Sequence, residues 1–469
     1  MKTSIKSLTL QTLFLFCFLS TVSAGPLNYY LQHHQRKQPN LVVSKTLTEQ
    51  YFDQMIDHKD PSIGSFKQRY YIDATYGKKK NSPVFLYLCG ESACTKEDLG
   101  DAIKMHAKKY HAIVIALEHR YYGKSLPFKF LSTNDLRYLT TEEALEDIAL
   151  FQEKMTKKNS WTGKWIAFGG SYPGSLAAYY RLKYPQLVTG ALASSAPVRA
   201  KKDFFEYDTH VTKVVGPKCA NNVRTAIAAI ESTLTDTVAF EAIKERFNAT
   251  EIEDPIDFLS LLADIGASAV QYGDVSSFCD ALATGATPLD GYVTFSNQLF
   301  AELDVAPVEL SNQGFLSTDP RDYKKGNDGF RQWVYQTCTE YGYEQNANPD
   351  PSQSTRSHLV NSDYQNQVCE RLFSLHKPAN TELMNKTYYT PLLKSPASNI
   401  LFTNGENDPW STLSLSEKNG NNHNDKLTYL TIEGASHCED LNGPGKDDSA
   451  SLIKARKTMH DLLKVWLAD

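Results

Sequence analysis

The chain has 469 residues, of which 41% are hydrophobic and 22% charged, and its formal net charge at pH 7 is −5. This composition provides a sizeable buried core and excludes wholesale disorder, and 25 glycines with 20 prolines are too few for a collagen-like or linker protein. The only dense basic run is Lys78-Lys79-Lys80, so nucleic acid is not an expected partner.

The N-terminus has the pattern of a secretory signal peptide. Lys2 and Lys6 precede an apolar run from Leu8 to Leu19, and the small residues Val22-Ser23-Ala24 follow. Because a membrane-spanning helix needs roughly 20 apolar residues, we predict a signal peptide over residues 1–24 rather than an anchor. No later segment is long and apolar enough to span a membrane. We therefore expect the protein in the secretory pathway, either secreted or lysosomal.

Cysteine usage fits this route. Removal of the signal peptide would take away Cys17 and leave an odd number of cysteines, so at least one thiol has no disulfide partner. No CxxC pair and no HExxH motif occurs, so we expect disulfides rather than a zinc site. Proximity favours the pairs Cys89–Cys94, Cys219–Cys279 and Cys338–Cys369, with the connectivity left open by sequence alone. Two sequons predict glycosylation at Asn248 and Asn385.

From residue 66 to 200 the pattern alternates between strand and helix. Short apolar runs bounded by turn residues are typical of strands buried on both faces of a parallel sheet. The predicted strands cover residues 83–88, 112–117, 165–168 and 192–195. Thr140 and Glu143 form a capping-box signal for a helix that continues to about Met155. This order predicts a doubly wound α/β sheet, with residues 25–200 as the first part of the core.

The middle of the chain has a helical pattern. Apolar residues recur at helical spacing from Val223 to Leu234, and again after the start signal Asp254-Pro255. The alternation of strand and helix then returns, with predicted strands over residues 399–403 and 427–432 and a C-terminal helix over 450–467. We therefore predict one α/β core interrupted by a helical cap at 201–395, with residues 396–469 as the second part of the core.

A serine stands at the turn between the third predicted strand and the next helix, in Gly169-Gly170-Ser171-Tyr172-Pro173-Gly174. Small residues around Ser171 suit the sharp turn of a nucleophile elbow, which would expose its hydroxyl and direct the Tyr172 N–H toward an oxyanion. The usual pattern is G-x-S-x-G, whereas here Pro173 stands at position +2 and Gly174 at +3. A plain tight turn is the alternative for this motif by itself. A phosphate loop is disfavoured because neither glycine-rich nucleotide motif is present.

Two later loops complete a catalytic triad in the chain order of α/β-hydrolases, which is Ser, then Asp or Glu, then His. Each predicted strand after the cap runs into a small-residue loop, the first with Asp408 and the second with His437. We predict that Asp408 orients His437 and that His437 removes the Ser171 proton. Glu406 and Glu433 are the alternative acids.

The loop after the first predicted strand is the expected source of a second oxyanion donor. It contains Gly90, Glu91 and Ser92, and it lacks the HGGG motif of many lipases. Glu91 indicates a cationic or hydrogen-bonding group nearby or, as the alternative, the capped start of a helix.

The chain resembles the S28 family of serine peptidases, which includes lysosomal Pro-X carboxypeptidase, dipeptidyl-peptidase II and thymus-specific serine protease. The segments that carry the resemblance span roughly residues 45–465 and are YFDQ (51–54) with DH (57–58), EHRYYGKS (118–125), NDLRYLT (134–140), the Ser171 turn, WVYQTCTE (333–340), NDPWS (407–411) and SHC (436–438). Residues 337–342 and His437-Cys438 favour the thymus-specific branch. Pro173 and Ser175 depart from the pattern of some members, which bears on the shape of the pocket.

The resemblance implies an α/β-hydrolase core with a helical cap, the triad Ser171, Asp408 and His437, and Trp410 in the wall of the S1 pocket. We therefore expect a serine exopeptidase that cleaves short peptides next to proline or a small apolar P1 residue, without a cofactor or metal. A carboxylesterase or lipase on the same core is the first alternative, and a non-catalytic binding protein is the second. The end of the peptide that is attacked and a homodimeric state are left open.

Overall fold

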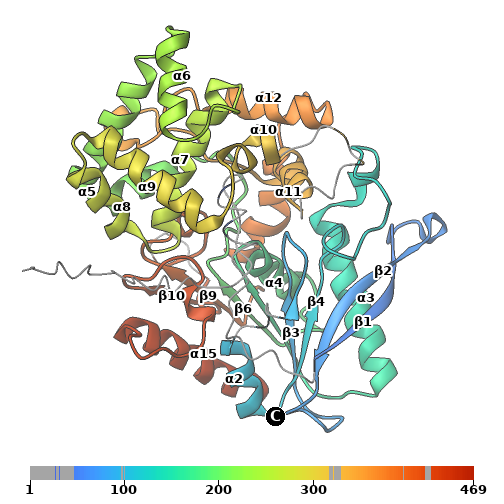
Figure 1. Ribbon diagram of the computed structural model, residues 1–469. Helices are drawn as coiled ribbons and strands as arrows, with labels where there is room; N and C mark the ends of the chain where they lie inside the picture. The colour runs from blue at the N-terminus through green and yellow to red at the C-terminus, as the bar shows by residue number, and fades with distance from the viewer. Residues whose placement is uncertain are drawn as a thin grey trace, which may run out of the picture.

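The computed structural model describes residues 27, 31, 47–96, 99, 101–315, 319, 321, 329–394, 396–417 and 424–468, so the predicted signal peptide lies outside the described residues. At its centre is an eight-stranded sheet with the order β1-β2-β4-β3-β5-β6-β9-β10 (Figure 1). The strands are β1 Thr48–Met55, β2 Ser65–Asp73, β3 Val84–Leu88, β4 Ile113–Leu117, β5 Trp165–Gly170, β6 Gly190–Ser194, β9 Ile400–Gly405 and β10 Thr428–Ile432. β2 is antiparallel to β1 and β4, and the other neighbours are parallel.

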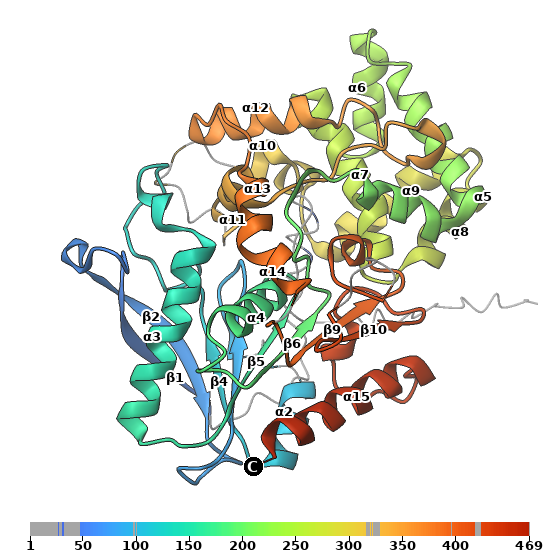
Figure 2. The same ribbon diagram turned by 180° about the vertical axis from the view of Figure 1, so that it is seen from behind.

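The parallel strands are buried on both faces, as their apolar runs predicted. In β3, Leu86 packs into one core cluster with residues of helices α3 (Thr141–Asn159) and α4 (Tyr172–Lys183). The neighbouring Phe85 packs into a second cluster with α2 (Asp101–Tyr110) and α15 (Ala450–Leu467). Helices therefore cover both faces of the sheet (Figures 1 and 2), and the predicted α/β-hydrolase fold is confirmed.

Only one of the two hydrogen bonds expected for a capping box forms at the start of α3. Thr140 is the N-cap, and its side chain accepts a hydrogen bond from the Glu143 N–H at 3.2 Å. The Glu143 carboxylate does not return to the cap, because it accepts hydrogen bonds from the His58 N–H and from the buried Arg120 guanidinium. The helix also runs to Asn159, four residues beyond the predicted end.

A long, mostly helical segment joins β6 to β9, and we call it the cap. Its helices are α5 Glu206–Glu231, α6 Thr237–Arg246, α7 Pro255–Gln271, α8 Val275–Thr284, α9 Pro288–Leu303, η4 Pro307–Leu310, α10 Asn312–Phe315, α11 Phe330–Gln336, η5 Thr337–Tyr341, η6 Pro351–Gln353, α12 Ser362–Phe373, α13 Thr381–Met384, η7 Asn385–Tyr389 and α14 Thr390–Leu392. Two short parallel strands, β7 Lys201–Asp203 and β8 Gly342–Glu344, form a small second sheet. The helical pattern predicted the cap but gave no sign of this strand pair.

Three disulfides join the pairs favoured by proximity. Cys219–Cys279 links α5 to α8, Cys338–Cys369 links η5 to α12, and Cys89–Cys94 closes the loop after β3. Cys438 is a free, buried cysteine. Two of the three disulfides therefore hold the cap together, and the third lies in the core.

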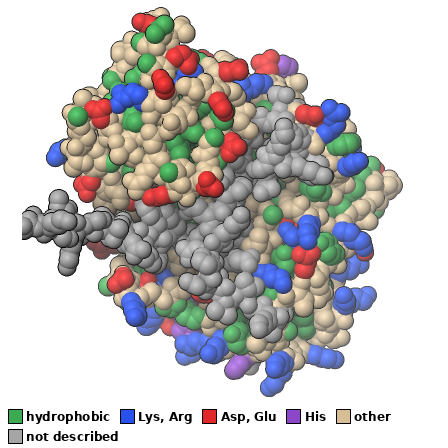
Figure 3. Space-filling view, viewed as in Figure 1, with side chains coloured by type: hydrophobic (Ala, Val, Ile, Leu, Met, Phe, Trp, Pro, Cys, Tyr) green, Lys and Arg blue, Asp and Glu red, His purple; other side chains and the backbone are tan. Residues whose placement is uncertain are grey.

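The cap lies at one end of the sheet in both views (Figures 1 and 2). On the face drawn in Figure 3, Asp and Glu side chains gather over the cap, and Lys and Arg side chains gather over the sheet part. Within the described part of the chain, no helix combines the length and apolarity needed to cross a membrane.

Candidate active site

Ser171 stands at the turn between β5 and α4 in a strained backbone conformation, with φ 61° and ψ −129°. Its N–H donates to the Ser194 carbonyl at 2.7 Å, which fixes the turn against the neighbouring strand. A Cβ atom on Gly169 would lie 2.1 Å from the Pro173 carbonyl oxygen, and one on Gly174 would lie 2.9 Å from that of Ser194. Both glycines are therefore sterically required, and the glycine at +3 permits the close approach of α4 to β6.

The structure brings together the three residues predicted for the triad. His437 Nε2 lies 3.0 Å from Ser171 Oγ, and His437 Nδ1 lies 2.8 Å from Asp408 Oδ1. Asp408 follows β9 and His437 follows β10, as their order along the chain predicted. The alternative acids Glu406 and Glu433 are exposed, whereas Asp408 is the carboxylate at His437 Nδ1.

The triad is closed off from solvent. Ser171 and Asp408 are 0% exposed and His437 is 1% exposed. The prediction that the Ser171 hydroxyl is exposed at the elbow is therefore wrong, because His437 lies against it and the cap reaches the same end of the sheet. Electrostatic interactions inside such a site are stronger than in water.

Two opposing effects act on the His437 imidazole. Burial is the largest single effect and lowers its pKa, but the neighbouring Asp408 and Cys438 side chains together outweigh burial and raise the pKa above the ordinary histidine value. Burial also raises the pKa of the neighbouring Cys438 thiol, which favours the neutral thiol. Asp408 is the largest of the contributions that raise the pKa of His437, and Cys438 adds to it.

The residues predicted for the oxyanion site lie at neighbouring strand ends. Tyr172 opens α4, where the first N–H groups of a helix have no partner within the helix. Gly90 and Glu91 follow β3, which is hydrogen-bonded to β5. Glu91 is fully buried, and its charge reaches Tyr172, whose pKa is raised first by burial and further by the Glu340 and Glu91 carboxylates.

Two residues that sequence reasoning left without a role hold the Tyr172 side chain. His119 Nε2 lies 2.9 Å from the Tyr172 hydroxyl, and Gln336 donates a hydrogen bond to that hydroxyl at 2.8 Å. Burial lowers the pKa of His119 to about 4, so its imidazole is neutral at pH 7. Both residues lie in segments that carry the family resemblance, which was the only signal of their importance.

Asp440 also escaped prediction, and it fixes the loop that carries His437. Its carboxylate accepts hydrogen bonds from Ser194 Oγ at 2.5 Å and from Thr403 Oγ1 at 2.7 Å. In the same loop the Cys438 N–H donates to Ser195 Oγ at 2.9 Å. The His437 loop is thereby tied to the ends of β6 and β9.

Trp410 is fully buried rather than set in an open wall. Its ring centroid lies 5.3 Å from that of Phe204, 5.6 Å from Tyr207 and 5.3 Å from Tyr343, all of which belong to the cap segment. Its indole N–H donates to Gln271 Oε1 at 3.1 Å. Trp410 therefore joins the Asp408 loop to the cap.

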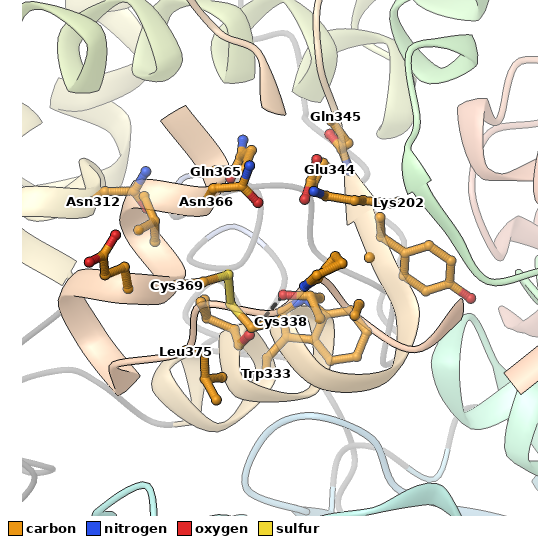
Figure 4. Close-up of a pocket in the computed structure, with 18 of the residues that line it drawn as sticks. Lys202, Asn312, Trp333, Cys338, Glu344, Gln345, Gln365, Asn366, Cys369 and Leu375 are labelled. Carbon is orange, nitrogen blue, oxygen red and sulfur yellow. Dashed lines mark hydrogen bonds between the residues drawn. A yellow bond between two sulfur atoms is a disulfide. The ribbon is translucent and has the colours of Figure 1, made fainter. Parts of the chain in front are cut away.

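A cavity of about 340 Å³ lies within the cap (Figure 4). Lys202, Glu344 and Gln345 gather at one side, and Asn312, Gln365 and Asn366 extend from nearby helices, beside the Cys338–Cys369 disulfide. None of the triad residues lines the cavity, but Trp333 and Tyr343 do, and they contact Tyr172 and Trp410 respectively. Aromatic side chains therefore lie between the lining of the cavity and the residues next to Ser171 and Asp408. Among the described residues, no cluster of three or more His, Cys, Asp or Glu side chains is arranged to hold a metal ion.

The fold and this geometry define a serine hydrolase of the α/β-hydrolase class. The sequence profile of the family named Serine carboxypeptidase S28 matches residues 54–459. The chain is 34% identical to "Probable serine protease EDA2" of Arabidopsis thaliana, with 96% of each chain covered. It is 32% identical to thymus-specific serine protease of Homo sapiens, covering 86% of this chain and 83% of that one. It is 27% identical to lysosomal Pro-X carboxypeptidase of Bos taurus, covering 98% and 97%. The chain therefore belongs to the serine carboxypeptidase S28 family and is a serine-type peptidase.

Proposed function

We propose that this peptidase is an exopeptidase that hydrolyses short peptides next to proline or a small apolar P1 residue, through an acyl-enzyme. The observation that carries the catalytic part is the pair of contacts from His437, 3.0 Å to Ser171 Oγ and 2.8 Å to Asp408 Oδ1. A nucleophile, a base and an orienting acid in this geometry support acyl transfer.

In the proposed mechanism His437 takes the Ser171 proton through Nε2 as Ser171 Oγ attacks the scissile carbonyl carbon. Asp408 holds Nδ1 and stabilises the imidazolium that forms. The Tyr172 N–H and an N–H of the loop at Gly90 and Glu91 receive the oxyanion. His437 then protonates the leaving amine, and a water activated by the same imidazole releases the acyl group and restores Ser171.

The cap supports action on chain ends. A buried triad beneath a helical cap admits the end of a short peptide more easily than the middle of a folded protein. Trp410, two residues after the acid, is the proposed apolar wall for a compact P1 ring. The name of the bovine relative, lysosomal Pro-X carboxypeptidase, supports a preference for proline.

We place the enzyme in the secretory pathway, secreted or lysosomal, on the basis of the signal-peptide pattern and the disulfides. Asn248 is exposed and is the better of the two candidate glycosylation sites. The Asn385 amide donates to the Ala200 carbonyl at 2.7 Å and accepts from the Ala200 N–H at 2.9 Å, contacts that a glycan would disturb.

The test is mass spectrometry of the products from a peptide with proline penultimate at both ends, alongside p-nitrophenyl esters. Release of one residue from the C-terminus, or of a dipeptide from the N-terminus, supports the proposal and identifies the end attacked. Hydrolysis of the esters without any peptide cleavage would assign the site to esterase chemistry instead. Ser171→Ala serves as the control for contaminating peptidases.

A further inference from the structure

We propose that Gln271, the last residue of the cap helix α7, is a positioning residue for Asp408 and His437. This inference rests on the proposed function, because it concerns the same triad. Gln271 is 0% exposed and lies among residues that approach the catalytic loops from the cap side. It does not act on the substrate directly.

The first contact is made by the backbone. The Gln271 carbonyl oxygen accepts a hydrogen bond from the His437 N–H at 3.1 Å. Carbonyl groups in the last turn of a helix have no partner within the helix. The His437 N–H therefore satisfies a carbonyl group at the end of α7, and this hydrogen bond fixes the backbone of His437.

The second contact is made by the side chain. Gln271 Oε1 accepts hydrogen bonds from the Trp410 indole at 3.1 Å and from the Tyr207 hydroxyl at 2.7 Å. The amide nitrogen donates to the Tyr272 hydroxyl at 3.0 Å, so both ends of the amide are held. The amide is therefore oriented, and it holds the Trp410 ring in a single position.

Trp410 passes this restraint to the triad acid. The backbone N–H of Trp410 donates to Asp408 Oδ1 at 2.9 Å, the same oxygen that lies 2.8 Å from His437 Nδ1. Gln271 is therefore linked to His437 through its carbonyl and to Asp408 through its side chain. One cap residue sets the separation of the two loops, and a misplacement of about 1 Å in such a site costs up to about 100-fold in rate.

The test compares three variants by fluorophosphonate labelling rate and by kcat and KM per titrated active site. Gln271→Met keeps the backbone carbonyl and the approximate shape but removes the acceptor for Trp410 and Tyr207. Gln271→Glu keeps an acceptor at that position. Gln152→Met is the matched control, because Gln152 is also a buried helical glutamine that accepts from a tyrosine, Tyr180, at 2.6 Å, but within the α3–α4 packing.

We expect Gln271→Met to lower both kcat and the labelling rate by about 10- to 100-fold. Gln271→Glu should restore most of that loss, whereas Gln152→Met should lower the melting temperature and leave both rates at the parent level. Equal per-site rates in all variants would overturn the inference, and so would a change in KM alone, which would assign Gln271 to substrate binding. A parent enzyme that is not labelled at all would instead contradict the proposed function.

Discussion

His437 is the residue on which the proposed chemistry depends most, because it contacts the nucleophile with one ring nitrogen and the acid with the other. Burial by itself would lower its pKa, and the neighbouring Asp408 and Cys438 side chains together raise it. A neutral imidazole is the form that accepts the serine proton. The pH range of activity and the effect of changing Asp408 both follow from this balance.

Replacing Asp408 with Asn should leave the fold intact and lower kcat by roughly 10⁴-fold, because the amide favours the wrong imidazole tautomer. The measurement is kcat per labelled active site, with circular dichroism as the check on folding. A variant within tenfold of the parent would move the role of the acid to another carboxylate.

The acid limb of kcat/KM should lie above the ordinary histidine value of about 6.5. Asp408 and Cys438 together raise the pKa of His437, so the imidazole becomes protonated and inactive as the pH falls through that raised value. In Asp408→Asn the residual activity should show this limb at lower pH. A parent profile that is flat from about pH 4 to 8 would argue against a histidine base.

Substitution of Trp410 tests its proposed role in P1 selectivity. Because Trp410 is fully buried, the substitution must keep most of the ring. Trp410→Ala would leave a cavity among Phe204, Tyr207 and Tyr343 and cost about 3–5 kcal/mol of stability. Trp410→Phe keeps an aromatic ring and removes the indole donor. We expect this variant to stay folded, to raise KM and to broaden P1 preference in a peptide panel, and also to lower kcat because the hydrogen bond to Gln271 is lost. An unchanged panel would remove Trp410 from the S1 wall.

Among the helices and strands, the sequence predicted those whose positions follow from hydrophobic periodicity and turn residues. Six parallel strands and α15 fall within a few residues of their expected positions. β1 and β2 escaped prediction because they are antiparallel strands at one side of the sheet, and β1 is polar and largely exposed. At the site, chain order was enough to select three residues, Ser171, Asp408 and His437, that the structure brings into contact. Asp440 and Gln271 were missed because they act through contacts between segments far apart in sequence.

Helix α7 carries a second testable group, Asp264, whose pKa is raised to about 7 by burial. An unfolded aspartate releases its proton near 3.9, so between about pH 4 and 7 the folded chain binds the additional proton. The free energy of unfolding should therefore fall as the pH rises through this range. Asp264→Asn should weaken that dependence in urea titrations at several pH values, and an unchanged slope would contradict the assignment. Burial also raises the pKa of Glu340 to about 7. Because Glu340 is present in both the parent and the Asp264→Asn variant, the difference between their slopes reports on Asp264.

For the molecule as a whole, the proposed exopeptidase function implies that the cap selects substrates by size. Ser171, Asp408 and His437 are buried, and Gln271 of the cap contacts the loops that carry Asp408 and His437. We expect peptides of a few residues to be cleaved and folded proteins to be spared. The measurement is the cleavage of each substrate when short peptides and folded proteins are digested together. Rapid internal cleavage of casein-sized substrates would contradict the exopeptidase assignment.

The central claim is that Ser171 is the nucleophile of a serine peptidase, and covalent labelling tests it most directly. Only an activated serine reacts readily with a fluorophosphonate, so peptide mapping of the labelled enzyme should place the adduct on Ser171. Ser171→Ala should take up no label and lose on the order of 10⁶ in kcat, with a melting temperature near that of the parent. An adduct on another serine, or appreciable turnover by Ser171→Ala, would contradict the account.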